Sequence, residues 1–252
     1  MLMLVMEQQP AYVLHSRPWR ETSVIADLLT LHSGRVSVII KGARKASGKQ
    51  PAKRALVQPF TPLLVAFTGR GELRTATSLD AAGPPLSLQG RHLYSGLYAN
   101  ELLLKLLAVD DAYPALFAYY QTLLGELANK LPLEQCLRPF EVHLMDELGY
   151  HVALDKEFET QIPVLPEHCY RLIPLQGFCR VKHQDGNTQP IPGHVLLELA
   201  AGRFSEPSCL KYAKYIARAN IDQLLGGKPL HSRTLFQSMA VAPPPSQGLI
   251  DN

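Results

Sequence analysis

The sequence VSVIIKGARKASGKQPAKR, residues 36–54, joins a β-like apolar run to a strongly basic loop. Valine and isoleucine occupy four of its first five positions and favour a strand. No Asp or Glu occurs between residues 41 and 54, and Gly42, Gly48 and Pro51 break any regular element. We therefore expect a cationic loop attached to the end of a strand. Its basic residues are Lys41, Arg44, Lys45, Lys49, Lys53 and Arg54.

Further strand-like runs surround this one between residues 10 and 80. With residues 34–40 they make five, the others being 11–14, 23–29, 63–67 and 73–78. Turn signals such as Gly69-Arg70-Gly71 separate them. Five short strands in about 70 residues predict a small barrel, and the OB-fold, a host for nucleic-acid strands, has that number. A small SH3-like barrel stays open as an alternative.

The periodicity becomes helical after Gly83-Pro84-Pro85. Leucine spacing predicts helices over residues 93–107, 116–127 and 133–148, and Pro139 is expected to kink or restart the third. An irregular segment follows.

The C-terminal part of the chain returns to helical patterns after a small hairpin. The hairpin is predicted from residues 170–173 and 177–182, with Asp185-Gly186 as a turn signal. Helices over 192–201 and 207–225 and a final short helix follow.

These elements predict an α+β multidomain chain: a five-stranded OB-fold barrel, then a mostly α-helical domain with a small irregular or β insertion. The expected boundaries are a DNA-binding barrel at 1–80, a helical domain at 81–154, an insertion at 155–190, the helical domain continued at 191–239, and a disordered tail at 240–252.

Bulk composition limits the class of protein. The chain has 25 Lys and Arg against 22 Asp and Glu, a net charge of only +3, so any polyanion site must come from local clustering. The four cysteines form no C-x-x-C pair, and no run reaches the roughly 18 apolar residues of a membrane span. We expect a cytoplasmic, soluble protein with no membrane partner.

Motifs for enzyme chemistry are missing from the sequence. It has no G-x-S-x-G, H-E-x-x-H or G-x-G-x-x-G, and Pro229 follows Lys228 where a phosphate-binding loop would have Ser or Thr. We therefore predict no catalytic residues, no cofactor and no enzymatic activity.

Positive charge is concentrated between residues 17 and 54, where nine basic residues and two acidic ones give 9 − 2 = +7. Such a cluster on a barrel favours sequence-independent phosphate contacts over a merely solvated hairpin. Trp19, in a loop-like stretch, is the candidate base-stacking ring, whereas Phe60 and Phe67 are expected in the barrel core. The predicted DNA-binding residues are Arg17, Trp19, Arg20, Arg35, Lys41, Arg44, Lys45, Lys49, Lys53 and Arg54, those from 49 to 54 in a mobile part of the loop.

A metal site is not expected. His168-Cys169 and Cys179-x-x-x-His183 place zinc-compatible residues on both arms of the hairpin. Neighbouring side chains on extended backbone point to opposite faces, however, and fit a tetrahedral site poorly.

Several motifs recur in a specific order across most of the chain. They are AYVLHSRPWRETS (11–23), SGRV with KGARK (33–45), LxQPFTP (56–62), YSGLYxNELL (94–103), RxFE with LGY (138–150) and LGGKPLxSR (225–233). In this combination the chain resembles the RecO family of bacterial DNA-repair mediators.

The resemblance implies binding to single- and double-stranded DNA, annealing of complementary strands and partnership with RecR. It also implies an interaction with the acidic, hydrophobic C-terminal tail of single-strand DNA-binding protein (SSB), help in loading RecA on SSB-coated DNA, and a nucleoid-associated location. An alternative is a protein-interaction adaptor whose helical domain captures that acidic tail, with DNA binding secondary. Candidate carboxylate partners are Arg91, Lys105, Arg138 and Arg218. An OB-fold RNA binder is a third alternative.

One departure from the family concerns zinc. In many members of the family that the chain resembles, the sequence from the position of Gly149 onward reads Gly-Tyr-x-x-x-Leu-x-x-Cys-x-x-Cys, and its cysteines hold a structural zinc ion. Here the two cysteine positions are Glu157 and Thr160, so we expect no bound metal.

Overall fold

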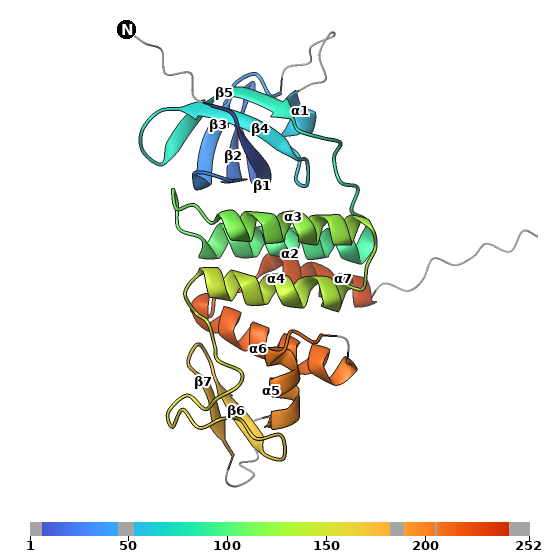
Figure 1. Cartoon of the computed structure of the whole chain (residues 1–252). Helices are drawn as coiled ribbons and strands as arrows, with labels where there is room; N and C mark the ends of the chain where they lie inside the picture. The colour runs from blue at the N-terminus through green and yellow to red at the C-terminus, as the bar shows by residue number, and fades with distance from the viewer. Residues whose placement is uncertain (1–6, 45–52, 182–188, 205, 242–252) are drawn as a thin grey trace, which may run out of the picture.

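The computed structural model describes residues 7–44, 53–181, 189–204 and 206–241. A barrel lies at one end of the molecule, stacked helices form the middle, and a small sheet lies at the other end (Figure 1). The predicted α+β architecture is confirmed.

The N-terminal strands close into a five-stranded barrel in the order β1-β2-β3-β5-β4, as expected for an OB-fold. All neighbours are antiparallel except β3 and β5. The closed core holds alternate side chains, as in β3, where Val36, Val38 and Ile40 point inward. The strands are β1 (Gln9–Trp19), β2 (Ser23–Thr30), β3 (Gly34–Ile40), β4 (Leu63–Thr68) and β5 (Leu73–Ala81).

The first strand is longer than predicted. Trp19 is its last residue and pairs with Ser23, so its assignment to a loop was wrong. The chain reverses only after Trp19, where Arg20 adopts a left-handed φ of 50°.

The five long helices predicted from the sequence are confirmed. They are α2 (Gly90–Leu106), α3 (Pro114–Ala128), α4 (Leu133–Glu147), α5 (Gly193–Ala200) and α6 (Pro207–Leu224), with a short α1 (Lys53–Leu56) before β4 and the final α7 (His231–Val241). Helix α4 runs through Pro139 without restarting, contrary to one of the two expectations for that residue.

The small sheet has the order β7-β6-β8 and contains the predicted hairpin. Its strands are β6 (Cys169–Ile173), β7 (Gly177–Arg180) and β8 (Ile191–Pro192). The hairpin turns at Leu175, which has a φ of 64°, and the predicted turn at Asp185-Gly186 lies outside the described residues.

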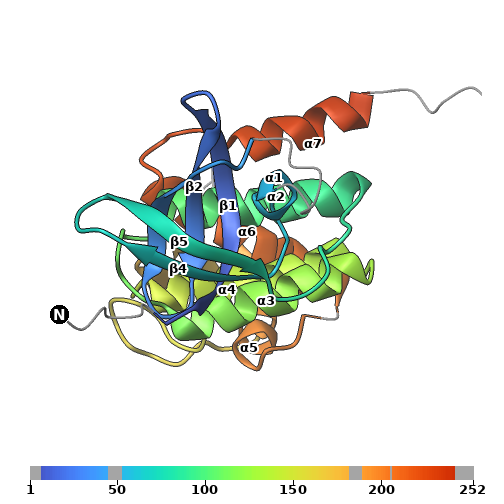
Figure 2. The same ribbon diagram turned by 90° about the horizontal axis from the view of Figure 1, so that it is seen from above.

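The barrel rests on α2 and α3 and shares a core with them (Figures 1 and 2). The side chains of Tyr12, Leu14 and Leu29 point out of the barrel and pack in the main hydrophobic cluster of the helices. Between the layers, Asn100 Nδ2 donates to the carbonyl of Leu14 at 3.1 Å, and the Tyr120 hydroxyl donates to Asn100 Oδ1 at 2.5 Å. The buried amide therefore satisfies backbone and side-chain groups across the junction.

Phe60 also belongs to this junction, so its assignment to the barrel core was wrong, whereas Phe67 does lie there. A β-carbon added to Gly96 would lie 2.8 Å from the Phe60 ring. The glycine on α2 thus leaves the space that the ring occupies.

Candidate nucleic-acid interface and peptide pocket

The tip of the β1–β2 hairpin and the chain after β3 form one cationic surface on the barrel. The amide of Arg44 donates to the carbonyl of Thr22 at 3.0 Å, and buried Ala43 anchors the loop in the barrel core. This pairing brings Arg20, Lys41 and Arg44 to the same end of the barrel, where all three side chains are exposed. We call this the hairpin-tip surface; its members are Arg17, Trp19, Arg20, Lys41 and Arg44.

Trp19 gives this surface an aromatic side. Its side chain is 39% exposed and, with Arg20, Ile39 and Lys41, it lines an open hollow. The Arg20 guanidinium lies 5.9 Å from the centre of the indole ring. A ring beside exposed cations has the composition of a site for an unstacked base and its phosphates.

Arg17 precedes Trp19 on the same exposed face of β1. Its guanidinium lies 3.9 Å from the buried carboxylate of Asp27, which also accepts a hydrogen bond from Ser37 and lies 3.6 Å from His15. The Arg17 side chain is 57% exposed, so this long ion pair leaves it accessible to a phosphate.

Other predicted DNA-binding residues lie elsewhere. Arg35 Nε donates to the carbonyl of Leu107 at 3.1 Å, which ties it to the helical layer. Lys53 and Arg54 are exposed and belong to α1, so their assignment to a loop was wrong. Lys45 and Lys49 lie outside the described residues.

A second cationic site lies among α2, α4, α6 and α7. Three of the four predicted tail-binding residues line it: Arg91, Arg138 and Arg218. Lys214 and Arg233 bring it to five cations, against Glu134 and Glu141, a balance of 5 − 2 = +3. Leu133, Leu137 and Phe236 add apolar walls. We call this the α4–α6 pocket.

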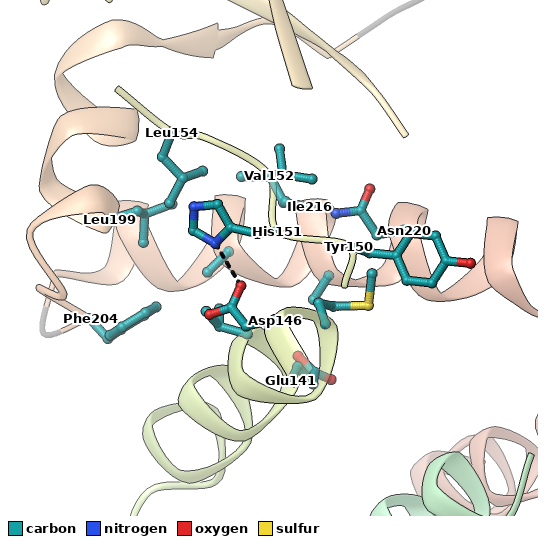
Figure 3. A pocket seen from close by; sticks show the side chains of 14 residues that line it. Glu141, Asp146, Tyr150, His151, Val152, Leu154, Leu199, Phe204, Ile216 and Asn220 are labelled. Carbon is teal, nitrogen blue, oxygen red and sulfur yellow. Dashed lines mark hydrogen bonds and ion pairs between the residues drawn. The ribbon is translucent and has the colours of Figure 1, made fainter. Parts of the chain in front are cut away.

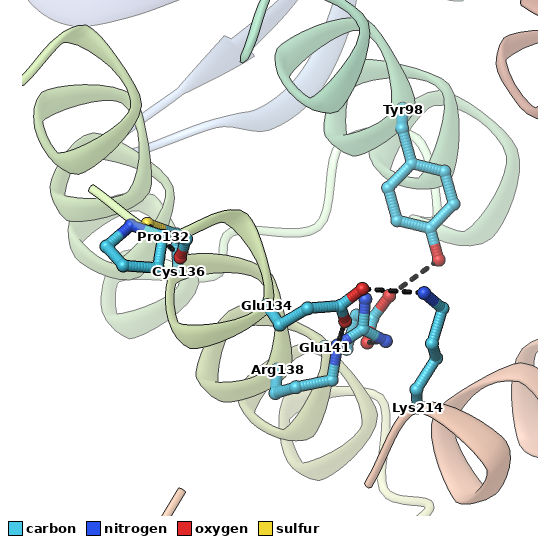
Figure 4. Close-up of polar contacts among 7 residues, drawn as sticks. All are labelled: Tyr98, Pro132, Glu134, Cys136, Arg138, Glu141 and Lys214. Atoms are coloured by element: carbon cyan, nitrogen blue, oxygen red, sulfur yellow. Dashed lines mark hydrogen bonds and ion pairs between the residues drawn. The ribbon is translucent and has the colours of Figure 1, made fainter. Parts of the chain in front are cut away.

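The fixed part of the pocket is a buried ion-pair network (Figure 4). Arg138, only 5% exposed, pairs with Glu141 and, at 3.1 Å, with Glu134. Lys214 Nζ binds Glu134 at 2.6 Å, and the Tyr98 hydroxyl donates to Glu141 at 2.7 Å. These bonds hold Arg138 rigidly at the base of the pocket.

Burial sets the proton equilibria of the network. Desolvation raises the pKa of Glu141 despite the attraction of Arg138, and it also raises the pKa of Tyr98. The pKa of Glu134 is lowered, because the bond from Lys214 and the charge of Arg138 outweigh desolvation. Among the described residues no ion pair engages Arg91 or Arg218, and both of these lining residues are exposed.

Lys105, the fourth predicted residue, lies outside this pocket. Its ammonium binds the carbonyl of Pro229 at 2.8 Å and Glu101 at 3.0 Å. Lys214 was not predicted, although its spacing from Arg218 on α6 places both on one helical face.

A mostly apolar hollow lies nearer the C-terminal end of α4, against α6 and the chain after α4, and shares Glu141 with the α4–α6 pocket (Figure 3). Met145, Leu199 and Ile216 are among its lining residues. His151 Nδ1 and Asp146 Oδ1 meet at 2.7 Å on its edge. No function was predicted for these residues.

The residues at the family's zinc-cysteine positions do not fit zinc. The Thr160 hydroxyl donates to the Glu157 carboxylate at 2.7 Å, and Gln161 Nε2 donates to the Glu157 carbonyl. A threonine hydroxyl is not among the cysteine, histidine and carboxylate ligands that structural zinc sites use. The part of the chain that the structure describes contains no group of three residues suited to a metal ion. In the same part, no helix is long and apolar enough to cross a membrane.

Comparison with known families agrees with these observations. The model for the N-terminal region of recombination protein O matches residues 3–84, and the model for its C-terminal region matches residues 88–234. The chain belongs to the RecO family. The RecO resemblance found in the sequence is therefore confirmed.

Full-length relatives in the RecO family are similar throughout. The DNA repair protein RecO of Marinobacter nauticus is 45% identical over 233 residues, covering 91% of this chain and 94% of the relative. That of Pseudomonas aeruginosa strain LESB58 is 42% identical over 236 residues, covering 93% and 97%. That of Coxiella burnetii is 40% identical over 230 residues, covering 90% and 97%.

Proposed function

We propose that this chain is a non-enzymatic DNA-binding mediator of recombinational repair. In this proposal it binds single- and double-stranded DNA, anneals complementary strands and, with RecR, helps RecA to load on SSB-coated DNA. Membership of the RecO family supports the role in repair. The observation that carries DNA binding is the hairpin-tip surface, where an exposed indole lies among accessible cations.

Binding by this surface follows from simple electrostatics. Lysine and arginine neutralise phosphates and release counterions, and an aromatic ring can stack on a base of any sequence. Four exposed cations and one ring, carried by the end of β1 and the two loops beside it, match an extended single strand. Binding of this kind requires no activated nucleophile or general base.

Trp19 permits a direct test, because it is the only tryptophan in the chain. We expect oligo-dT to quench its fluorescence as binding saturates, since the indole stacks on an unpaired base. A duplex of the same length should bind with less quenching, because its bases remain paired.

The matched control for this test is Trp19→Phe, followed by anisotropy of a labelled oligonucleotide. It should bind single strands with reduced affinity, and Trp19→Ala should bind more weakly still. Full binding of oligo-dT without any change in Trp19 emission would reject the stacking role.

A second function, capture of an acidic tail, is favoured by the α4–α6 pocket. Arg91 and Arg218 line it with exposed guanidinium groups that form no ion pair with another described residue, and Leu137 and Phe236 offer an apolar contact. A peptide with several carboxylates and an apolar side chain, such as the SSB tail, fits that combination.

The barrel, which carries the hairpin-tip surface, and helices α4 and α6, which help to line the pocket, lie on opposite sides of the α2–α3 layer (Figure 1). We therefore expect a labelled acidic peptide to bind in the presence of saturating oligo-dT. Arg218→Ala should weaken peptide binding about tenfold, through loss of a charge-assisted contact, whereas the exposed control Lys156→Ala should not. Equal affinities of the two variants would reject the pocket assignment.

A further inference from the structure

We propose that the end of the molecule opposite the barrel is a docking surface for a partner protein that presents a basic segment with apolar side chains. The first observation is charge. Residues 142–167 contain six Asp or Glu and one Lys, a balance of 1 − 6 = −5. Because the whole chain carries +3, the remainder carries 3 − (−5) = +8. The segment 142–167 is therefore acidic, and the exposed basic residues at the same end of the molecule, Arg171 and Arg180, lie outside it on the small sheet.

The second observation is an excess of exposed apolar side chains in the same segment. Val142, Tyr150, Phe158 and Ile162 are between 37% and 53% exposed. Large apolar groups clustered on a surface and rimmed by polar residues are typical of protein interaction sites. We call this the α4-end surface; it comprises these four residues with Asp146, His151, Asp155 and Glu159.

The third observation is shape. The apolar hollow beside α4 and a second hollow lined by Phe158 both have His151 in their walls, so the two are neighbours on the surface. Buried Met145, Leu199 and Ile216 contribute to the first hollow (Figure 3). A side chain of a partner can enter there, which a flat apolar patch would not allow.

The carboxylates around these hollows determine the chemistry of the partner. Asp155 and Glu159 are exposed, and neither forms an ion pair with another described residue. An incoming Lys or Arg would therefore displace no existing ion pair at these positions, whereas Asp146 is held by His151. A polyanion such as DNA is repelled by the same charges, so the occupant is a basic protein segment.

A designed peptide can test the chemistry on the full-length protein. The probe is a fluorescein-labelled helical peptide with leucine on one face and lysine on the other, and its matched control replaces every lysine by glutamate. The lysine peptide should bind with a measurable Kd and the glutamate peptide should not. A photo-reactive group in place of one leucine should cross-link within residues 142–162.

Variants separate the apolar and charged contributions. Phe158→Ser with Ile162→Ser should weaken binding of the lysine peptide about tenfold, and Asp155→Asn with Glu159→Gln about threefold at low salt. Asp155→Asn with Glu159→Gln changes only exposed side chains to nearly isosteric ones. It should therefore fold normally and test the proposal even if Phe158→Ser with Ile162→Ser impairs folding. The control Leu131→Ser, at another exposed leucine, should leave the Kd unchanged, and DNA binding should be the same in all variants.

Three results would overturn the proposal. One is equal binding of the lysine and glutamate peptides, and another is a Kd that none of the surface substitutions alters. The third is concentration-dependent self-association that Ile162→Ser abolishes, because the occupant would then be a second copy of the chain.

Discussion

Glu101 on α2 anchors the terminal helix α7 against the rest of the molecule. Its carboxylate accepts bonds from the amides of His231 and Ser232 at 2.9 and 2.8 Å and from the Ser232 hydroxyl at 2.7 Å. Helix α7 in turn contributes Arg233 and Phe236 to the α4–α6 pocket. We predict that Glu101→Gln loosens this helix and weakens binding of an acidic peptide that Glu101 itself does not contact.

The size of the effect follows from these bonds. Glutamine keeps one acceptor oxygen but places an NH2 group where the second oxygen met Ser232, and it removes the charge at a helix N-terminus. A lost bond to a charged group is worth about 1.5 kcal/mol at such a partly accessible site, which corresponds to about tenfold in an equilibrium constant.

The pKa of Glu101 gives the same anchor a pH dependence. Burial raises the pKa, but the bonds from Ser232 and His231 outweigh it and lower the value from 4.5 to about 2. The folded-state value lies below the unfolded one, so the contribution is complete above about pH 4.5 and is lost as pH falls towards 2. Glu101→Gln should lack this part of the acid sensitivity.

Hydrogen exchange measures the anchor directly. We expect exchange of the amides of residues 231–236 to be about tenfold faster in Glu101→Gln, while amides of the barrel strands exchange as in the wild type. Peptide affinity should fall by no more than tenfold, in proportion to the fraction of molecules that keep α7 docked, because only those molecules have a complete pocket. Unchanged exchange at residues 231–236 would refute the role of Glu101.

Three further predictions concern stability. Gly34→Ala should lower the free energy of unfolding, measured by urea titration, by about 3 kcal/mol or more, because φ is +64° and a β-carbon would lie 1.7 Å from the Asp111 carbonyl oxygen. The control Gly202→Ala has a similar φ of +70° but open space around it, so it should lower the same free energy by only about 1 kcal/mol. Asn100→Leu should lower the free energy of unfolding by about 2–3 kcal/mol in the same assay, since it leaves the Leu14 carbonyl and the Tyr120 hydroxyl without a partner. A smaller loss of unfolding free energy than that of Tyr120→Phe would contradict the role of Asn100 between the barrel and the helices. A chelator should leave Tm unchanged and Thr160→Val should lower it, because Thr160 and Glu157 stand at the two zinc-cysteine positions and are joined there by a hydrogen bond. A drop in Tm on adding the chelator would contradict this.

Local sequence signals were sufficient for most of the fold. The spacing of apolar residues shows which face each element buries. It does so by alternation in residues 34–40 and by leucine spacing in α2, α3 and α4. Trp19 and Phe60 were misplaced because their environment depends on contacts distant in sequence. The position of the β1–β2 turn places Trp19 on a strand, and the space left by Gly96 places Phe60 between the barrel and the helices.

The candidate sites could be predicted only in part for the same reason. Charge clustering identified Arg20, Lys41 and Arg44, whose proximity comes from neighbouring hairpin ends. It also included Arg35, because sequence does not reveal that a backbone carbonyl on another layer engages that side chain. The α4–α6 pocket combines four helices, and no spacing within one helix could have joined their residues.

Binding of DNA phosphates by the hairpin-tip surface is tested most directly by the salt dependence of affinity. The measurement is the slope of log K against log salt for oligo-dT binding to the full chain and to Lys41→Ala/Arg44→Ala. Each cation that neutralises a single-strand phosphate contributes about 0.7 to the slope, so the account predicts a decrease in its magnitude of about 1.4. An unchanged slope and affinity in the double variant would contradict the account.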